Sequence, residues 1–248
     1  MIQAMIFDLD GTLVQTEKLK ALSYARAAVE LCPVEISESE VIDAFKDVVG
    51  RSRREVATTL VDRFSLSEAA QSRKSEFGVS TPWQAFIQVR LRYYHAIMAD
   101  PQVLRDNRWS HNLALLEEAR RTHCKVGLAT MSRCEHVQRV LDVLGLSDAF
   151  HFVASRDDVD HGKPHPEIYQ LVARELEVPP GNCLVIEDSP SGVEAALVAG
   201  MWCIAVTTPF TKDQLHKADL LDRRWVVDDP ESLPVVVSQM YEERLEDR

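Results

Sequence analysis

Short apolar runs that alternate with segments of helical periodicity limit most strongly how this chain can fold. Six runs have the length and the aliphatic content of buried parallel strands, and most are followed by polar turn residues: Ile2–Phe7, Lys125–Ala129, Phe152–Ala154, Leu184–Ile186, Trp202–Val206 and Trp225–Val227. Helical patterns accompany the last five runs, at His111–Arg121, Glu135–Leu144, Glu167–Leu176, Gly192–Ala199 and near Ser232–Leu245. This alternation predicts an α/β fold with a Rossmann-like open parallel sheet flanked by helices.

A long helical segment interrupts this alternation directly after the first strand. Its helical patterns cover Glu17–Val29, Glu38–Val48, Arg54–Phe64 and Trp83–Ala99. We therefore expect a helical cap domain at residues 15–105 and an α/β core formed by residues 1–14 and 106–248. Because open α/β sheets bind ligands at the carboxyl ends of their strands, such a cap would form a lid over the site. The polar segment Ser65–Val79 is expected to be a long loop or hinge.

Composition narrows the class of protein. With 248 residues and 46% hydrophobic content the chain can bury a full core. A formal net charge of −11 argues against nucleic acid as a partner. No apolar run approaches the roughly 20 residues that span a bilayer, and the N-terminus lacks the features of a signal peptide. We expect a cytoplasmic protein with no membrane partner, and a monomer by default because the helices of the insert can bury one another.

The first cluster of chemically useful residues is Asp8-Leu9-Asp10-Gly11-Thr12, which follows the apolar run Met5–Phe7. A chain that turns at Gly11 can aim both carboxylates at one point above the strand end. Two close carboxylates repel each other, and a cation between them or a proton on one of them relieves the repulsion. In phosphoryl transfer, Asp8 can serve as nucleophile while Asp10 donates and accepts a proton. The alternative is that both aspartates only cap the following turn.

Two further clusters offer groups that bind phosphate. Thr130 is the first hydroxyl after an apolar strand, and with nearby backbone N–H groups it can hold a phosphate oxygen; taken alone, it is more often a helix cap. In Gly162-Lys163-Pro164-His165-Pro166, two prolines stiffen the backbone around one lysine. The Lys163 ammonium can neutralise a phosphate and a nucleophile together, although a solvated loop lysine is the alternative.

The fourth cluster is Glu187-Asp188-Ser189-Pro190-Ser191-Gly192, where two acids end a strongly apolar run. Carboxylate oxygens suit Mg²⁺, which completes its octahedral shell with water, backbone oxygen and substrate phosphate. Ser189 can at the same time cap the helix that follows. All four clusters lie at the carboxyl ends of predicted parallel strands, where the sheet would bring them together.

With these clusters in order, the chain resembles the haloacid dehalogenase-like hydrolase superfamily, whose four motifs match Asp8–Thr12, Thr130, Lys163 and Glu187–Asp188. The match covers essentially the whole chain. Two sequence motifs resemble more closely one branch of this superfamily, the β-phosphoglucomutase-like and sugar-phosphatase branch, which has a helical cap after the first motif. These motifs are Gly162-Lys163-Pro164-x-Pro166-x-Ile168-Tyr169 and Glu187-Asp188-Ser189-x-x-Gly192.

The resemblance implies a role for each core residue. Asp8 would be the nucleophile and Asp10 the general acid and base, while Thr130 and Lys163 would hold the phosphoryl group. The cofactor would be Mg²⁺, with the metal ligands Asp8, Asp188 and the backbone carbonyl of Asp10, and with Glu187 as a further acidic contributor. The dehalogenases of the superfamily lack the second aspartate, so Asp10 argues against carbon–halogen chemistry.

The resemblance also suggests residues that contact the substrate. The segment Val49–Glu55 is similar to the specificity loop of the β-phosphoglucomutase group, and Arg53 is the first choice for a cap residue that senses the substrate. Arg90 falls near a second cationic position of that group, with an exposed helix arginine as the alternative. The full set of candidate substrate contacts is Thr16, Lys20, Arg53, Arg90, Ser132 and Arg133.

Three functions remain in view at this point. The first is an Mg²⁺-dependent phosphatase that acts on a small phosphorylated metabolite, such as a sugar phosphate, through an aspartyl-phosphate on Asp8. The second is a sugar phosphomutase; it is less favoured because relatives with mutase activity commonly carry a histidine where this chain has Lys20. The third is a non-catalytic phosphometabolite-binding protein, which is disfavoured because every expected catalytic position is filled.

Overall fold

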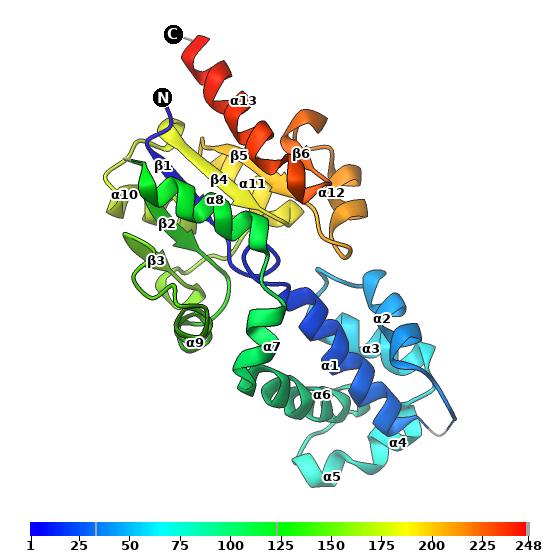
Figure 1. Ribbon diagram of the computed structural model, residues 1–248. Coiled ribbons are helices and arrows are strands. Elements are labelled where there is room, and N and C mark those ends of the chain that lie inside the picture. The colour runs from blue at the N-terminus through cyan, green and yellow to red at the C-terminus, as the bar shows by residue number, and fades with distance from the viewer. Residues whose placement is uncertain (33, 123, 247–248) are drawn as a thin grey trace. The chain divides into compact units, whose positions relative to one another are not determined.

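The computed structural model describes residues 1–32, 34–122 and 124–246. Its described residues form a six-stranded sheet in the order β3-β2-β1-β4-β5-β6, with every neighbouring pair parallel (Figure 1). The strands are β1 (Ala4–Phe7), β2 (Lys125–Ala129), β3 (Phe152–Ala154), β4 (Cys183–Glu187), β5 (Trp202–Val206) and β6 (Val226–Val227). This arrangement confirms the predicted Rossmann-like sheet, whose strand order reverses direction at β1 and β4.

Helices cover both faces of this sheet (Figure 1). The helices of the α/β core are α8 (Ser110–Arg121), α9 (Cys134–Leu144), α10 (Glu167–Glu175), α11 (Pro190–Val198), α12 (Lys212–Ala218) and α13 (Leu233–Glu246). On one face α10 and α11 pack against alternate strand residues such as Ala4, Ile6 and Val185, all of them buried. Helices α8 and α13 pack together, and α8 lies against β2. Within the described chain, no helix has the length and apolarity that a membrane span requires.

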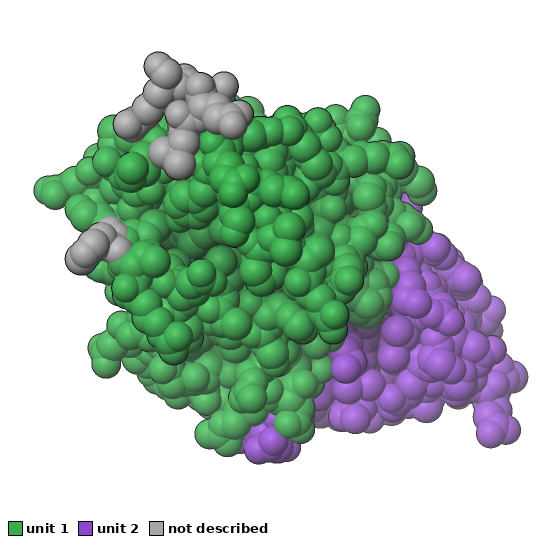
Figure 2. All heavy atoms as spheres, turned by 45° about the horizontal axis from the view of Figure 1, so that its top comes forward, with its two compact units in different colours: residues 1–15, 104–248 green, residues 16–103 purple. Residues whose placement is uncertain are grey.

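The residues between β1 and α8 form a helical insertion. The chain divides into two compact units, unit 1 with residues 1–15 and 104–248 and unit 2 with residues 16–103 (Figure 2). The helices of the insertion are α1 (Thr16–Leu31), α2 (Glu38–Lys46), α3 (Arg53–Arg63), α4 (Ser67–Ser72), α5 (Lys74–Phe77), α6 (Pro82–Ala99) and α7 (Pro101–Asp106). Capping boxes start α2 and α3, and aromatic contacts of Tyr24 with Phe45 and Phe86 join α1 to α2 and α6.

The prediction of a long loop or hinge at Ser65–Val79 was wrong, because the segment contains α4 and α5. Both helices are very short and mostly polar, and Ala70 is the one buried residue within the described spans of α4 and α5. A helix of one or two turns presents too few apolar positions for helical periodicity to be detected. Leu66, buried just before α4, and the glycine C-cap Gly78 hold the segment in place.

The two ends of the insertion lie side by side within unit 1. The Gln15 amide donates to the carbonyl oxygen of Asn107 at 2.8 Å, and the Trp109 amide donates to Leu13 at 2.9 Å. Val14 also forms an antiparallel bridge with Arg108. The outgoing and returning segments are therefore hydrogen-bonded to each other where they join the core.

Close packing of β2 against α10 gives the first prediction. A Cβ atom on Gly127 would lie 2.4 Å from the Val172 Cγ1 atom and 3.2 Å from the Leu176 Cδ1 atom. Because both neighbours are buried, we expect Gly127→Ala to lower the free energy of unfolding by about 1–3 kcal/mol in urea denaturation. Gly181→Ala is the control, since its Cβ meets no described atom within 4 Å. Equal stability of the two variants would contradict this packing.

Candidate functional site

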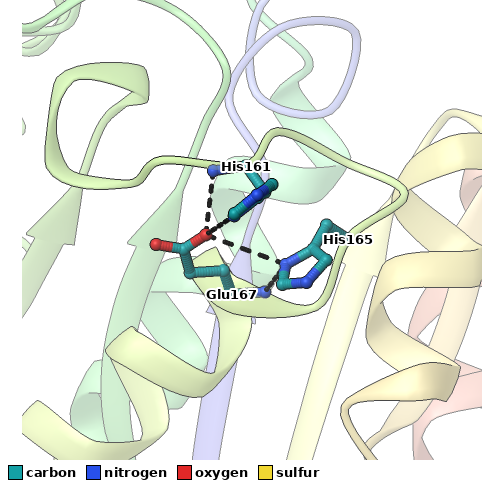
Figure 3. Close-up of side chains that lie close together, drawn as sticks. All are labelled: His161, His165 and Glu167. Carbon is teal, nitrogen blue, oxygen red and sulfur yellow. Dashed lines mark hydrogen bonds and ion pairs between the residues drawn. The ribbon is translucent and has the colours of Figure 1, made fainter.

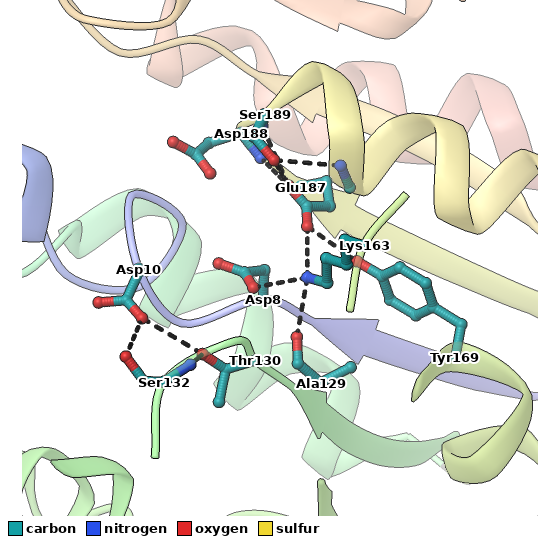
Figure 4. A network of polar contacts seen from close by, with 11 residues as sticks. Asp8, Asp10, Ala129, Thr130, Ser132, Lys163, Tyr169, Glu187, Asp188 and Ser189 are labelled. Atoms are coloured by element: carbon teal, nitrogen blue, oxygen red, sulfur yellow. Dashed lines mark hydrogen bonds and ion pairs between the residues drawn. The ribbon is translucent and has the colours of Figure 1, made fainter. Parts of the chain in front are cut away.

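A buried lysine lies at the centre of the polar residues above the sheet (Figure 4). The Lys163 side chain is 4% exposed, and its Nζ atom donates to Asp8 Oδ1 at 2.7 Å, to the Ala129 carbonyl at 3.0 Å and to Glu187 Oε1 at 2.5 Å. An ammonium group has three protons, so each proton has an acceptor. The structure therefore excludes the alternative of a solvated loop lysine.

The register of the sheet explains why three acceptors meet at this one point. Phe7 of β1 pairs with Leu128 of β2 on one side and with Ile186 of β4 on the other. Each acceptor is the residue that directly follows one of these three paired residues. Since the strands are parallel, the acceptors emerge side by side at the same edge of the sheet.

Glu187 accepts hydrogen bonds on both of its carboxylate oxygens. Oε1 accepts from the Tyr169 hydroxyl at 2.9 Å in addition to the lysine, and Oε2 accepts from the Asp188 amide at 2.9 Å. The Ser189 amide and hydroxyl also donate to Oε2, each at 3.0 Å. A Cβ atom on Gly192 would lie 1.8 Å from Oε1, so only glycine leaves room for this carboxylate. Glu187 is thus fully enclosed by protein donors.

Two predictions about helix starts have different outcomes. Ser189 caps α11, as expected, because its hydroxyl accepts from the Gly192 amide at 3.2 Å. The alternative reading of Thr130 as a helix cap was wrong. The N-cap residue of α9 is Arg133, an exposed residue whose side chain forms no capping bond.

The hydroxyl of Thr130 instead contacts Asp10. Thr130 Oγ1 lies 3.2 Å from Asp10 Oδ2, and the Ser132 hydroxyl donates to the same oxygen at 2.5 Å. On the other side, His136 Nε2 lies 3.9 Å from Asp10 Oδ1. Groups from the end of β2 and the start of α9 therefore surround the Asp10 carboxylate, and its contact with Thr130 and Ser132 is drawn in Figure 4.

Gly11 allows Asp188 to approach the loop after β1. Its φ of +91° belongs to the left-handed region, and a Cβ atom there would lie 2.0 Å from Asp188 Oδ2. The carboxylates of Asp8, Glu187 and Asp188 are buried and offer oxygen atoms that all lie within 4.8 Å of one another. Because the donors are hard oxygens, this group fits Mg²⁺ chemically.

The electrostatics of the site follow from burying more carboxylates than ammonium groups. Burial raises the pKa of Asp8 to about 8, with Lys163 opposing the shift and Glu187 and Asp10 adding to it. Burial acts in the same direction on Glu187, but Lys163 and the hydrogen bonds from Ser189 and Tyr169 together hold the pKa of that carboxyl below its usual value. Of these two carboxyls, Asp8 is therefore the one whose pKa lies above its usual value.

Four of the candidate substrate contacts belong to unit 2. Thr16 begins α1 and is buried, and Arg53 is the exposed first residue of α3. Lys20 donates to Glu17 at 2.7 Å. The network around Lys163 is built from residues of unit 1.

Arg90 also belongs to unit 2, and it is buried there. Its guanidinium carbon lies 4.8 Å from the ring centroid of Tyr24 and 4.3 Å from that of Tyr94. The side chain is thus held between two aromatic rings by cation–π contacts. The alternative of an exposed helix arginine is wrong, since Arg90 is 5% exposed.

Tyr169 and His136 are site residues that the sequence did not single out for a role. Tyr169 belongs to a motif that resembles the family, but no role was predicted for it, and its hydroxyl contacts Glu187. The position of Tyr169 on the buried face of α10 could have indicated such a role, because a buried phenol requires a hydrogen-bond partner. His136 follows Thr130 by six residues, and its proximity to Asp10 depends on how α9 begins.

The raised pKa of Asp8 gives a prediction for the protein in a chelator. The folded state favours the protonated acid, so this contribution to stability is full below about pH 4 and is lost as the pH rises through about 8. We expect Asp8→Asn to gain stability relative to the parent between about pH 5 and 8, by at most about 1.4 kcal/mol per pH unit. Urea unfolding across this range measures it. Exposed Asp148→Asn should parallel the parent, and an Asp8→Asn curve that does the same would refute the shift.

Comparison with known proteins adds to this geometry. The profile of the haloacid dehalogenase-like hydrolases matches residues 2–200. The phosphorylated carbohydrates phosphatase of Thermotoga maritima is 28% identical over 81% of this chain and 82% of its own. The β-phosphoglucomutase of Bacillus subtilis is 26% identical over 83% of each chain.

A solved structure shares the architecture. The crystal structure of β-phosphoglucomutase from Clostridium difficile aligns over 100% of both chains, with a TM-score of 0.65 and 26% identity. The likeness predicted from the four strand-end clusters, including that to the β-phosphoglucomutase-like branch, is therefore confirmed. Since the family profile spans most of its length, this chain belongs to the haloacid dehalogenase-like hydrolase family.

Proposed function

We propose that this protein is an Mg²⁺-dependent phosphatase that hydrolyses a small phosphorylated metabolite, of the sugar phosphate class, through an aspartyl-phosphate on Asp8. One observation carries the proposal. The Asp8 carboxylate contacts the buried ammonium of Lys163, while Asp10, two residues later, is held by the hydroxyls of Thr130 and Ser132. This combination supplies a nucleophile, a cation and a proton-transfer group at one strand end.

The metal would be held by the carboxylates of Asp8 and Asp188 and by the backbone carbonyl of Asp10. The oxygen donors of this cluster support that assignment. Glu187 was also a candidate ligand, but the donors on both of its oxygens favour a role in positioning Lys163. When bound, Mg²⁺ supplies positive charge that offsets the repulsion between carboxylates and phosphate.

In the first half of the reaction, an Asp8 oxygen attacks phosphorus and the bond between phosphorus and the ester oxygen breaks. Asp10, protonated at this stage, gives its proton to the departing alkoxide. Lys163 neutralises charge on the transferring phosphoryl oxygens, and the Thr130 hydroxyl donates to one of them. The products are the free alcohol and an aspartyl-phosphate on Asp8.

In the second half, water attacks phosphorus and the bond to the Asp8 oxygen breaks. Asp10, now a carboxylate, takes the proton from this water. Inorganic phosphate leaves, and both aspartates are then in their starting states, because Asp10 has regained from water the proton that it gave to the alkoxide. The contact with the Ser132 hydroxyl keeps Asp10 in place for both transfers.

The substrate class rests on the relatives, two of which are named for phosphorylated carbohydrates and for β-phosphoglucomutase activity. Among the cap residues, we propose Arg53 as the first choice for a residue that contacts the substrate. The candidates are Thr16, Lys20, Arg53, Arg90, Ser132 and Arg133. A panel of phosphorylated metabolites, assayed for phosphate release, would identify the preferred substrate.

The nucleophile is tested by Asp8→Asn. An amide cannot form the covalent intermediate, so we expect kcat/KM for phosphate release in Mg²⁺ to fall by about three orders of magnitude or more. Asp148→Asn, a change at an exposed aspartate, should leave the rate unchanged. If Asp8→Asn hydrolysed the best substrate of the panel as fast as the parent, the mechanism would be wrong.

Phosphomutase activity is the second candidate, and the β-phosphoglucomutase relatives favour it. Lys20 stands where a mutase commonly has a histidine, and it is paired with Glu17. The test is incubation with β-glucose 1-phosphate and a trace of the 1,6-bisphosphate. We expect inorganic phosphate to form faster than glucose 6-phosphate, and the opposite order would establish the mutase instead.

A further inference from the structure

The loop that carries Lys163 bears a second group of polar side chains on its solvent side. His161 and His165 lie on this loop, and Glu167 is the first residue of α10 (Figure 3). Their side chains are 68%, 50% and 30% exposed, whereas that of Lys163 is 4% exposed. The proposed phosphatase mechanism uses none of the three.

Both imidazole rings lie next to one carboxylate oxygen. Glu167 Oε2 lies 3.0 Å from His161 Nδ1 and 3.7 Å from His165 Nδ1. In a tetrahedral zinc site with bonds of about 2.0–2.1 Å, neighbouring ligand atoms lie about 3.3 Å apart. The two distances bracket this value, and the three residues offer ligand atoms that are all within 4.8 Å of one another.

The surrounding hydrogen bonds hold the carboxylate in place and charged. The amides of Asp160 and His161 donate to the two Glu167 oxygens at 3.0 and 2.8 Å. These bonds lower the pKa of Glu167 to about 2, so the group is an anion at neutral pH. His165 Nδ1 accepts from the Glu167 amide at 3.3 Å, a long hydrogen bond that a metal would replace.

The donor set selects a different metal from the one at Asp8. Two imidazole nitrogens and one carboxylate suit Zn²⁺, Co²⁺ or Ni²⁺, whereas Mg²⁺ prefers oxygen ligands alone. We propose that His161, His165 and Glu167 bind one divalent transition-metal ion of the Zn²⁺ class, with water completing the coordination. This ion would join the chain on either side of Lys163.

Cobalt is a suitable probe, because its visible absorption reports nitrogen ligation and coordination geometry. The full chain carrying Cys134→Ser, which removes an exposed thiol, would be titrated with Co²⁺ in excess Mg²⁺ so that the oxygen cluster is filled. We expect one equivalent to bind with a tetrahedral spectrum, and Zn²⁺ to displace it.

Single substitutions then assign the ligands. His161→Ala and His165→Ala, both at exposed side chains, should each weaken Co²⁺ binding by about 10-fold or more, and Glu167→Gln should do so while keeping an acceptor for the two amides. His216→Ala is the matched control, because His216 likewise lies 3.0 Å from a carboxylate, that of Asp228. Failure of the parent to bind Co²⁺ in Mg²⁺, or unchanged binding in both histidine variants, would overturn the proposal. The readout is binding, so it is independent of phosphatase activity.

Discussion

The buried ammonium of Lys163 is the interaction on which the arrangement of the site depends. Removing a charge from water costs several kcal/mol unless nearby groups compensate for it. Here the compensation comes from Asp8, the Ala129 carbonyl and Glu187, which end three adjacent strands. A shift of one residue in the register of any of these strands would remove one acceptor. The polar site and the pairing of the sheet therefore require each other.

Much of the core could be predicted because its determinants are local. Buried strands appear as uninterrupted apolar runs, and the polar residues that end them mark the ligand-binding edge of a parallel sheet. Lys163 and Glu187 were found in this way. The direct contact between Lys163 and Glu187 could not be predicted, because β3 and β4 are separated by α10 and the contact depends on strand order. For the same reason, the proximity of His136 to Asp10 could not be predicted, because the distance between them depends on how the sheet is assembled.

The inserted unit was harder to predict in detail. Its long helices show clear periodicity, but α4 and α5 are too short and polar to do so. Arg90 illustrates a second limit. An arginine in a helix usually indicates solvent exposure, whereas here one ring from α1 and one from α6 enclose its guanidinium. Tyr94 lies four residues away on the same helix, but Tyr24 belongs to another helix and could not be paired with Arg90 from sequence alone.

The hydrogen bonds between Gln15 and Asn107 and between Leu13 and Trp109 have a consequence for how such a protein can diversify. They hold the start and the end of the insertion next to each other using main-chain atoms, so the closure does not depend on which side chains the insertion carries. A loop whose ends are already together can lengthen, shorten or be exchanged at little entropic cost to the core. The insertion can therefore change in length and sequence without any rebuilding of the sheet.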